Sequence, residues 1–130
     1  MKSSKDYEEY LRANGESVTD GVMPHTALNT LINEGGLKKS EVIARSTIEE
    51  HYAYQILQGK KTPSRDKMIM LCIGLCLTPE QANDLLKLTG YAQLYAKNSR
   101  DNAVIFALTK KMSVIELNLM LDAQGLEIFE

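Results

Sequence analysis

The side chains best placed to do chemistry lie in one stretch of this sequence, STIEEHYAYQILQGKKTPSRDK, from Ser46 to Lys67. Within it Ala53, Ile56 and Leu57 are spaced as the inner face of one helix. The polar side chains between them should therefore point away from the core. Amides, imidazoles and carboxylates on such a face can hydrogen-bond to base edges, and the cations that follow can bind phosphate.

Two carboxylates at the start of this helix oppose a phosphate-binding function. Glu49 and Glu50 lie in its first turn, where a phosphate backbone should repel them. The pattern Thr47-x-x-Glu50 predicts a capping box, and Ser46-x-x-Glu49 offers the same device one residue earlier. We therefore expect the glutamates to satisfy free amides at the positive end of the helix.

The charge distribution favours the same stretch. The chain has a net charge of -2, but residues 38–67 hold seven basic and four acidic side chains. Residues 1–37 hold three basic and six acidic ones, and the remainder holds five and seven. The only positive segment is therefore the one that contains the polar helix.

Other kinds of site have little support. The two histidines, His25 and His51, are far apart, and there is no glycine-rich phosphate loop or recognisable nucleophile-base pair. Cys72 and Cys76 are not spaced as metal ligands and are predicted to be buried core thiols. We therefore expect no enzyme, no metal site and no cofactor.

The hydrophobic pattern predicts an all-α protein, because sustained alternation and hairpin signals are absent. The start, MKSSKDYEEYL, lacks the apolar run of a secretory signal, and the apolar segment 68–77 is too short to span a membrane. A cytoplasmic protein is expected. Helices are predicted in DYEEYLRANG, before Gly35-Gly36, at 40–46, 49–58, 64–76 and 79–89, and near 99–111 and 113–124.

A weak internal repeat links the last four of these helices. Ser64 to Tyr95 aligns with Ser99 to Glu130 at a constant offset of 35, with six identities in 32 positions. Both copies begin Ser-Arg-Asp, and their apolar positions, caps and stops coincide. The repeat predicts two consecutive helical hairpins of similar build.

Residues from about Leu28 to Leu88 resemble the phage-repressor or Cro-like (XRE) family of helix-turn-helix regulators. The resemblance rests on the helices 40–45 and 50–58, the turn between them, and the exit QGKKTPSRD into an apolar helix. It implies a five-helix repressor-like bundle over residues 24–95. Residues 1–23 then form a leader with a short helix, and residues 96–130 form an added C-terminal hairpin that packs on the domain.

Carrying the family pattern over by position implies a sequence-specific transcriptional regulator with its recognition helix in the major groove of double-stranded DNA. The residues implied to contact base edges are Glu50, His51 and Gln55. Those implied to contact phosphates are Lys39, Tyr54, Gln58, Lys60, Lys61, Thr62 and Arg65.

Two departures from the family pattern bear on the turn and on the packing of the motif. The usual glycine of the turn is Thr47, and a β-branched residue tolerates the left-handed conformation badly. We therefore expect a turn that is one residue longer, with Thr47 as the cap. The usual small residue of the first helix is Ile43 and the usual Ile or Val of the second is Ala53, an exchange that roughly conserves volume.

Roughly four to six phosphate contacts per subunit would suit two subunits on a pseudo-palindromic operator better than a monomer. The last helix, SVIELNLMLDAQG, carries apolar residues on more than one face, so a homodimer through the C-terminal hairpin is expected. The alternative is a protein-interaction adaptor or antagonist that reuses the scaffold, because an acidic, tyrosine-rich helix start also suits a basic protein partner. No membrane partner is expected.

Overall fold

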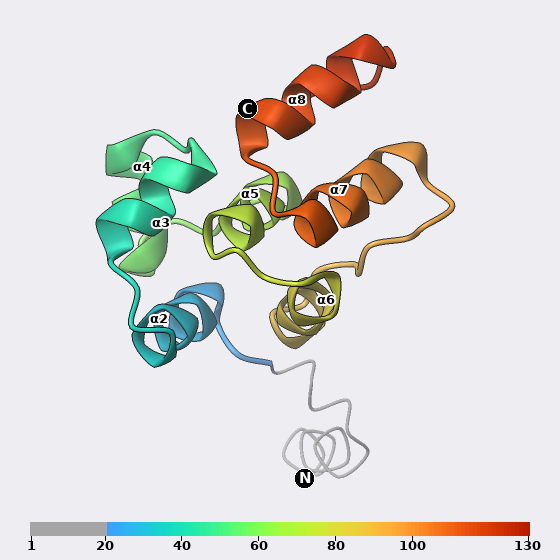
Figure 1. The fold of residues 1–130 in the computed structure, drawn as a ribbon. Helices are drawn as coiled ribbons and strands as arrows, with labels where there is room; N and C mark the ends of the chain where they lie inside the picture. Colours follow the sequence, from blue (N-terminus) through green and yellow to red (C-terminus); the bar gives the residue numbers. More distant parts are fainter. Residues whose placement is uncertain (1–20) are drawn as a thin grey trace, which may run out of the picture.

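A computed structural model describes residues 21–130 of the chain. Within these residues the fold is all-helical, with seven helices and no strand (Figure 1). The short helix expected in DYEEYLRANG lies outside the described residues. The helices are α2 (Pro24–Glu34), α3 (Lys39–Ser46), α4 (Glu50–Leu57), α5 (Arg65–Gly74), α6 (Pro79–Leu88), α7 (Ser99–Lys110) and α8 (Val114–Ala123).

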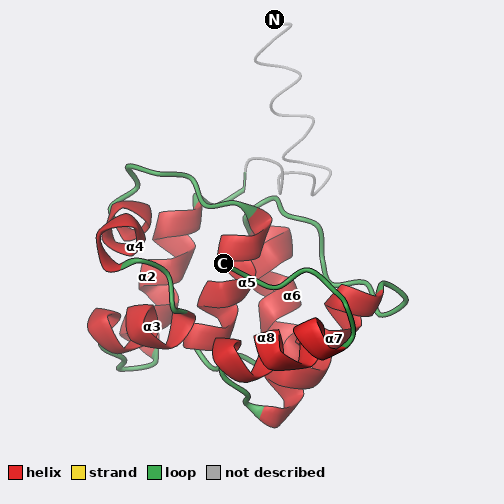
Figure 2. Ribbon diagram, turned by 90° about the horizontal axis from the view of Figure 1, so that it is seen from above, coloured by secondary structure: helices red, strands yellow, loops and turns green. Residues whose placement is uncertain are grey.

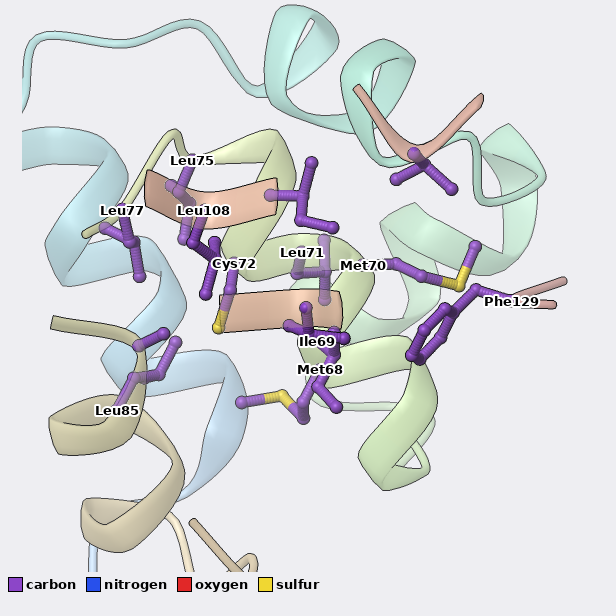
Figure 3. Close-up of a cluster of buried hydrophobic side chains, with 14 of the residues drawn as sticks. Met68, Ile69, Met70, Leu71, Cys72, Leu75, Leu77, Leu85, Leu108 and Phe129 are labelled. Atoms are coloured by element: carbon purple, nitrogen blue, oxygen red, sulfur yellow. The ribbon is translucent and has the colours of Figure 1, made fainter. Parts of the chain in front are cut away.

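Helix α5 lies at the centre of the fold. Figures 1 and 2 both show α2, α3 and α4 on one side of it and α6 and α7 on the other. Every residue of α5 from Met68 to Gly74 is buried, which explains why its sequence is apolar on all faces rather than amphipathic. In Figure 3 Met70 of α5 lies beside Phe129 of the C-terminal tail, so the core continues from the N-terminal helices to the end of the chain.

Close packing of α3 on α5 depends on a missing side chain. A Cβ atom at Gly74 would lie 2.5 Å from the carbonyl oxygen of Val42 and 3.2 Å from the amide nitrogen of Ser46. Arg45 of α3 reinforces the contact by donating from Nε to the carbonyl oxygen of Gly74 at 2.9 Å. The first half of the polar stretch is therefore held against the most buried helix of the protein.

The prediction of two buried cysteines is half wrong. Cys72 is buried, and desolvation raises the pKa of its thiol to about 12. Cys76 is exposed, because α5 ends at Gly74 and Cys76 turns the chain with a φ of 57°. The predicted helix 64–76 therefore extends two residues beyond the end of α5.

The two hairpins, α5–α6 and α7–α8, share their local geometry as well as their pattern. Both second helices begin with a capping box, formed by Thr78 and Gln81 in α6 and by Ser113 and Glu116 in α8. Cys76 and Lys111, 35 residues apart, turn the chain with φ angles of 57° and 56°. In both hairpins an asparagine side chain accepts a hydrogen bond from the tail that follows: Asn83 from Leu94, and Asn118 from Phe129.

Two reciprocal ion pairs join the two hairpins through their Ser-Arg-Asp sequences. Arg65 of the first hairpin pairs with Asp101 of the second at 2.9 Å, and Arg100 of the second pairs with Asp66 of the first at 3.0 Å. Each arginine also donates to carbonyl groups of the tail of its own hairpin. These are Ala92 and Gln93 for Arg65, and Glu127 and Ile128 for Arg100. The second hairpin is therefore clamped to the first by matched contacts in an approximately two-fold arrangement.

No helix among residues 21–130 is both long and apolar enough to cross a membrane.

Candidate nucleic-acid interface

The connection between α3 and α4 is short and partly strained. The Ser46 hydroxyl is buried, where it donates to the carbonyl oxygen of Ile43 at 2.7 Å and accepts from the amide of Ile48 at 3.2 Å. Thr47 follows with a φ of 62°, in the left-handed region that β-branched residues avoid. Thr47 therefore ends α3 in a left-handed conformation, and the expectation that it caps the start of α4 is wrong, because Glu49 occupies that position.

Glu49 is the residue that caps α4. Its carboxylate accepts from the amides of His51 and Tyr52, each at 2.9 Å, so neither of the two expected capping boxes forms. These hydrogen bonds, that from His51 foremost, lower the pKa of the Glu49 carboxyl. The expectation that the glutamates satisfy free helix amides is confirmed for Glu49, although by a different geometry, and is wrong for Glu50, whose side chain makes no such hydrogen bond within residues 21–130. Glu50 follows in the first turn, exposed.

The inner face of α4 is the predicted one. Ala53, Ile56 and Leu57 are buried, and α4 packs chiefly against α2. Ile43 of α3 is buried as well, as expected if its larger side chain offsets the smaller Ala53. The Asn29 side chain of α2 donates to the carbonyl oxygen of Leu57 at 2.9 Å and so ties the end of α4 to the neighbouring helix.

The opposite face of α4 is open to solvent in its first turn and partly covered further along the helix. Glu50 and His51 are exposed, while Tyr54 and Gln55 are half-buried. Tyr54 packs against the edge of the core, as does Tyr52, whose ring also lies 5.9 Å from the Lys67 ammonium group. The residues expected to contact base edges thus share one accessible face of the helix.

The loop after α4 has a defined geometry. The amides of Lys60 and Lys61 both donate to the carbonyl oxygen of Gln55, at 2.9 and 3.2 Å. Gly59 turns the chain with a φ of 81°, and a Cβ atom there would lie 3.0 Å from the ring of His25. The backbone therefore holds the loop against the end of α4. The exposed side chains that it presents there are those of Gln58, Lys60, Lys61 and Thr62.

The remaining predicted phosphate ligands lie in different places. Lys39 is exposed at the first turn of α3, and Lys38, which was not among the predicted phosphate contacts, is exposed at the N-cap beside it. The Lys-Lys pair was the signal for this second cation. Arg65 does not join the exposed group, because its guanidinium group is engaged by Asp101 and by two backbone carbonyls.

Among residues 21–130 no group of three or more His, Cys, Asp or Glu side chains is arranged to hold a metal ion. The candidate interface consists of hydrogen-bonding groups on α4 and of lysines at the two ends of the α3–α4 unit. A comparison with protein-family models, curated proteins and solved structures finds no match to this chain.

Proposed function

We propose that the chain is a DNA-binding transcriptional regulator in which α3 and α4 act as a helix-turn-helix. In this proposal α4 enters the major groove and presents Glu50, His51 and Gln55 to base edges. Lys39, together with Gln58, Lys60, Lys61 and Thr62, lies over the phosphates on either side. Tyr54 contributes its hydroxyl at the edge of the same surface.

The observation that carries this proposal is the position of two lysines beside a helix face that is accessible within residues 21–130. Lys60 and Lys61 follow α4 directly, their amides are anchored on Gln55, and their side chains are exposed. No ion pair within residues 21–130 involves either of them. Two cations held next to hydrogen-bonding groups suit a ligand that carries both phosphates and base edges.

The glutamates at the start of α4 oppose this function less than their charge suggests. The Glu49 carboxylate is bonded to two amides at the positive end of the helix dipole, so its charge offsets that of the helix terminus. Only Glu50 remains as an outward carboxylate in the first turn, and a carboxylate can accept a hydrogen bond from cytosine.

Selection of bound duplexes from a random DNA pool tests the proposal. The wild-type chain should enrich one motif, and the variant Lys60→Ala/Lys61→Ala should enrich none under the same salt. A suitable control is Lys87→Ala/Lys97→Ala, which removes the same charge from exposed positions outside the α3–α4 unit. Failure of the wild-type chain to enrich any motif would contradict the proposal.

A second function, binding a protein partner through the same face, is favoured by one observation. Glu41, Glu49 and Glu50 all lie exposed on the α3–α4 unit, and the whole chain has a net charge of -2. A basic protein surface complements these carboxylates. Two results together would favour this adaptor function: the chain selects no DNA motif, and it binds a basic protein in a way that Glu50→Lys abolishes.

A further inference from the structure

One apolar area of the second hairpin is not covered within residues 21–130. Ile115 and Leu119, one turn apart on α8, are 64% and 68% exposed. They line a hollow in the surface together with Asn118, Asp122 and Ile128 of the C-terminal tail. We call these five residues the α8 patch. The buried side of α8 is formed by other residues, so the helix has the second apolar face that its sequence indicated.

The first hairpin serves as an internal control for the α8 patch, because it has the same build and different side chains. Helices α6 and α8 correspond residue for residue at the offset of 35, and each begins at a capping box. The three apolar residues of the patch have polar, exposed counterparts in the first hairpin, namely Glu80, Asp84 and Gln93. The hairpin fold therefore does not require apolar residues at these positions, and another contact must account for them.

We propose that the α8 patch binds the same patch on a second copy of the chain, with the two α8 helices antiparallel. A two-fold axis then brings Ile115 of each copy against Leu119 of the other, because the two residues are one helical turn apart. The inference rests on the proposed function in one respect, since recognition of a palindromic site needs two subunits related by such an axis.

Charges at the two ends of α8 favour the antiparallel arrangement. Lys110 and Lys111 are exposed just before the helix, where they outnumber the exposed Glu116 of its first turn, and Asp122 is exposed in its last turn. In an antiparallel pair the basic end of one copy faces the acidic end of the other, whereas a parallel pair would bring like charges together. The two helix dipoles are also opposed in the antiparallel pair.

The polar residue of the patch that lies between Ile115 and Leu119 in the sequence already has hydrogen-bond partners within its own hairpin. The Asn118 amide group donates to the carbonyl oxygen of Phe129 and accepts from its amide, both at 2.8 Å. Burial of Ile115 and Leu119 beside it would therefore not leave these polar atoms without partners. A second copy can therefore cover Ile115 and Leu119 without breaking these two hydrogen bonds.

The size of the patch predicts a weak dimer. Three apolar side chains per copy fall below the area of a standard interface, which is roughly 800 Å² per partner. We expect a monomer–dimer equilibrium that moves toward the dimer as the concentration rises, and further when two half-sites hold the copies together.

Sedimentation velocity without DNA, over a series of protein concentrations, tests the interface. The variant Ile115→Glu/Leu119→Asp gives the second hairpin the residues of the first, and should raise the dimer dissociation constant by at least about tenfold. The matched control is Tyr95→Glu, which also exchanges an exposed residue, 61% accessible, for its counterpart in the other hairpin. This control should dimerise as the wild-type chain does.

Three results would overturn the inference: a wild-type monomer at every concentration, unchanged dimerisation of the double variant, or equal loss in the Tyr95→Glu control. Helical circular dichroism checks the fold, and the single variant Leu119→Asp replaces the double one if that one unfolds. The DNA experiment is separate. A monomer that selects a half-site would contradict only the α8 interface, whereas a dimer that selects no motif would contradict only the proposed function.

Discussion

Arg65 donates two hydrogen bonds to the carboxylate of Asp101, at 3.2 and 2.9 Å, across the boundary between the two hairpins. The Asp101 residue is 8% exposed and also accepts from the amide of Tyr95 at 3.0 Å. The pair thus joins α5, α7 and the segment between the hairpins. Its loss should loosen the second hairpin as a unit.

Arg65→Ala should lower the free energy of unfolding by about 2–4 kcal/mol, because it leaves the Asp101 carboxylate buried without its counter-charge. The comparable variant Arg100→Ala should cost less, since the Asp66 side chain is 39% exposed and water can solvate it. Urea unfolding of both variants measures the difference. Equal losses, or a larger loss at Arg100, would show that burial of the carboxylate does not determine the cost.

Glu49 should make stability depend on acid pH. Its pKa is lower in the folded than in the unfolded chain, because the amides of His51 and Tyr52 bond its ionised form. The stabilisation is therefore present above the unfolded pKa and is lost as the pH falls through the lower pKa of the folded chain. Thermal unfolding of Glu49→Gln should show a smaller drop in this acid range than the wild-type chain.

The neighbouring variant Glu50→Gln is the control, because it removes a charge from the same turn without removing a capping carboxylate. At neutral pH Glu49→Gln should be less stable than Glu50→Gln. In DNA binding, Glu49→Gln should leave the affinity unchanged or raise it. A loss of affinity would mean that the Glu49 carboxylate contacts the ligand instead of only capping the helix.

Thr47→Gly should raise the free energy of unfolding by roughly 0.5–1 kcal/mol. Its φ of 62° is unfavourable for a β-branched residue, and its side chain is exposed, so glycine relieves strain and loses little contact. Thr62→Gly is the matched control, because Thr62 is exposed but has no positive φ. That variant should be destabilised by about 0.5 kcal/mol through the added freedom of the unfolded chain. A gain at both positions would rule out the backbone explanation.

In α4 and the loop that follows it, residues that contact base edges and residues that contact phosphates should respond differently to mutation. Gln55→Ala should cost about 1–3 kcal/mol on the preferred DNA site and little on others. By contrast, Lys60→Ala should weaken all sequences alike and reduce the salt dependence of binding by about one counterion. Titrations of specific and random duplexes at two salt concentrations measure both effects. If neither variant changes binding, α4 does not lie in the major groove.

Helices with strong local signals could be predicted from the sequence. Thr78, Pro79 and Gly90 mark the ends of α6, and each occupies the expected cap, first-turn or stop position. The cap of α4 could not be predicted as easily, because glutamate is not among the preferred N-cap residues. The strained Thr47 is a similar case, since packing of α3 and α4 overrides the preference of a single residue.

Among the predicted site residues, Arg65 is the one whose environment in the structure differs most from the prediction. The family pattern made it a phosphate ligand, whereas its charge is engaged by Asp101 from a segment 36 residues away. A signal for this was present, because Ser-Arg-Asp opens both repeats and offers an opposite charge to each arginine. Local patterns cannot show which aspartate each arginine meets; the packing of the two hairpins determines it.

Gly74, where α3 packs closely on the first hairpin, corresponds to a residue with a side chain in the second hairpin. The residue 35 positions later is Thr109, whose hydroxyl donates to the carbonyl oxygen of Ile105 on the outer surface of α7. A helix could not approach α7 there as closely as α3 approaches α5, where even a Cβ atom would meet the Val42 carbonyl. Of the two hairpins, only the first therefore offers a position where another helix can pack as closely as α3 does.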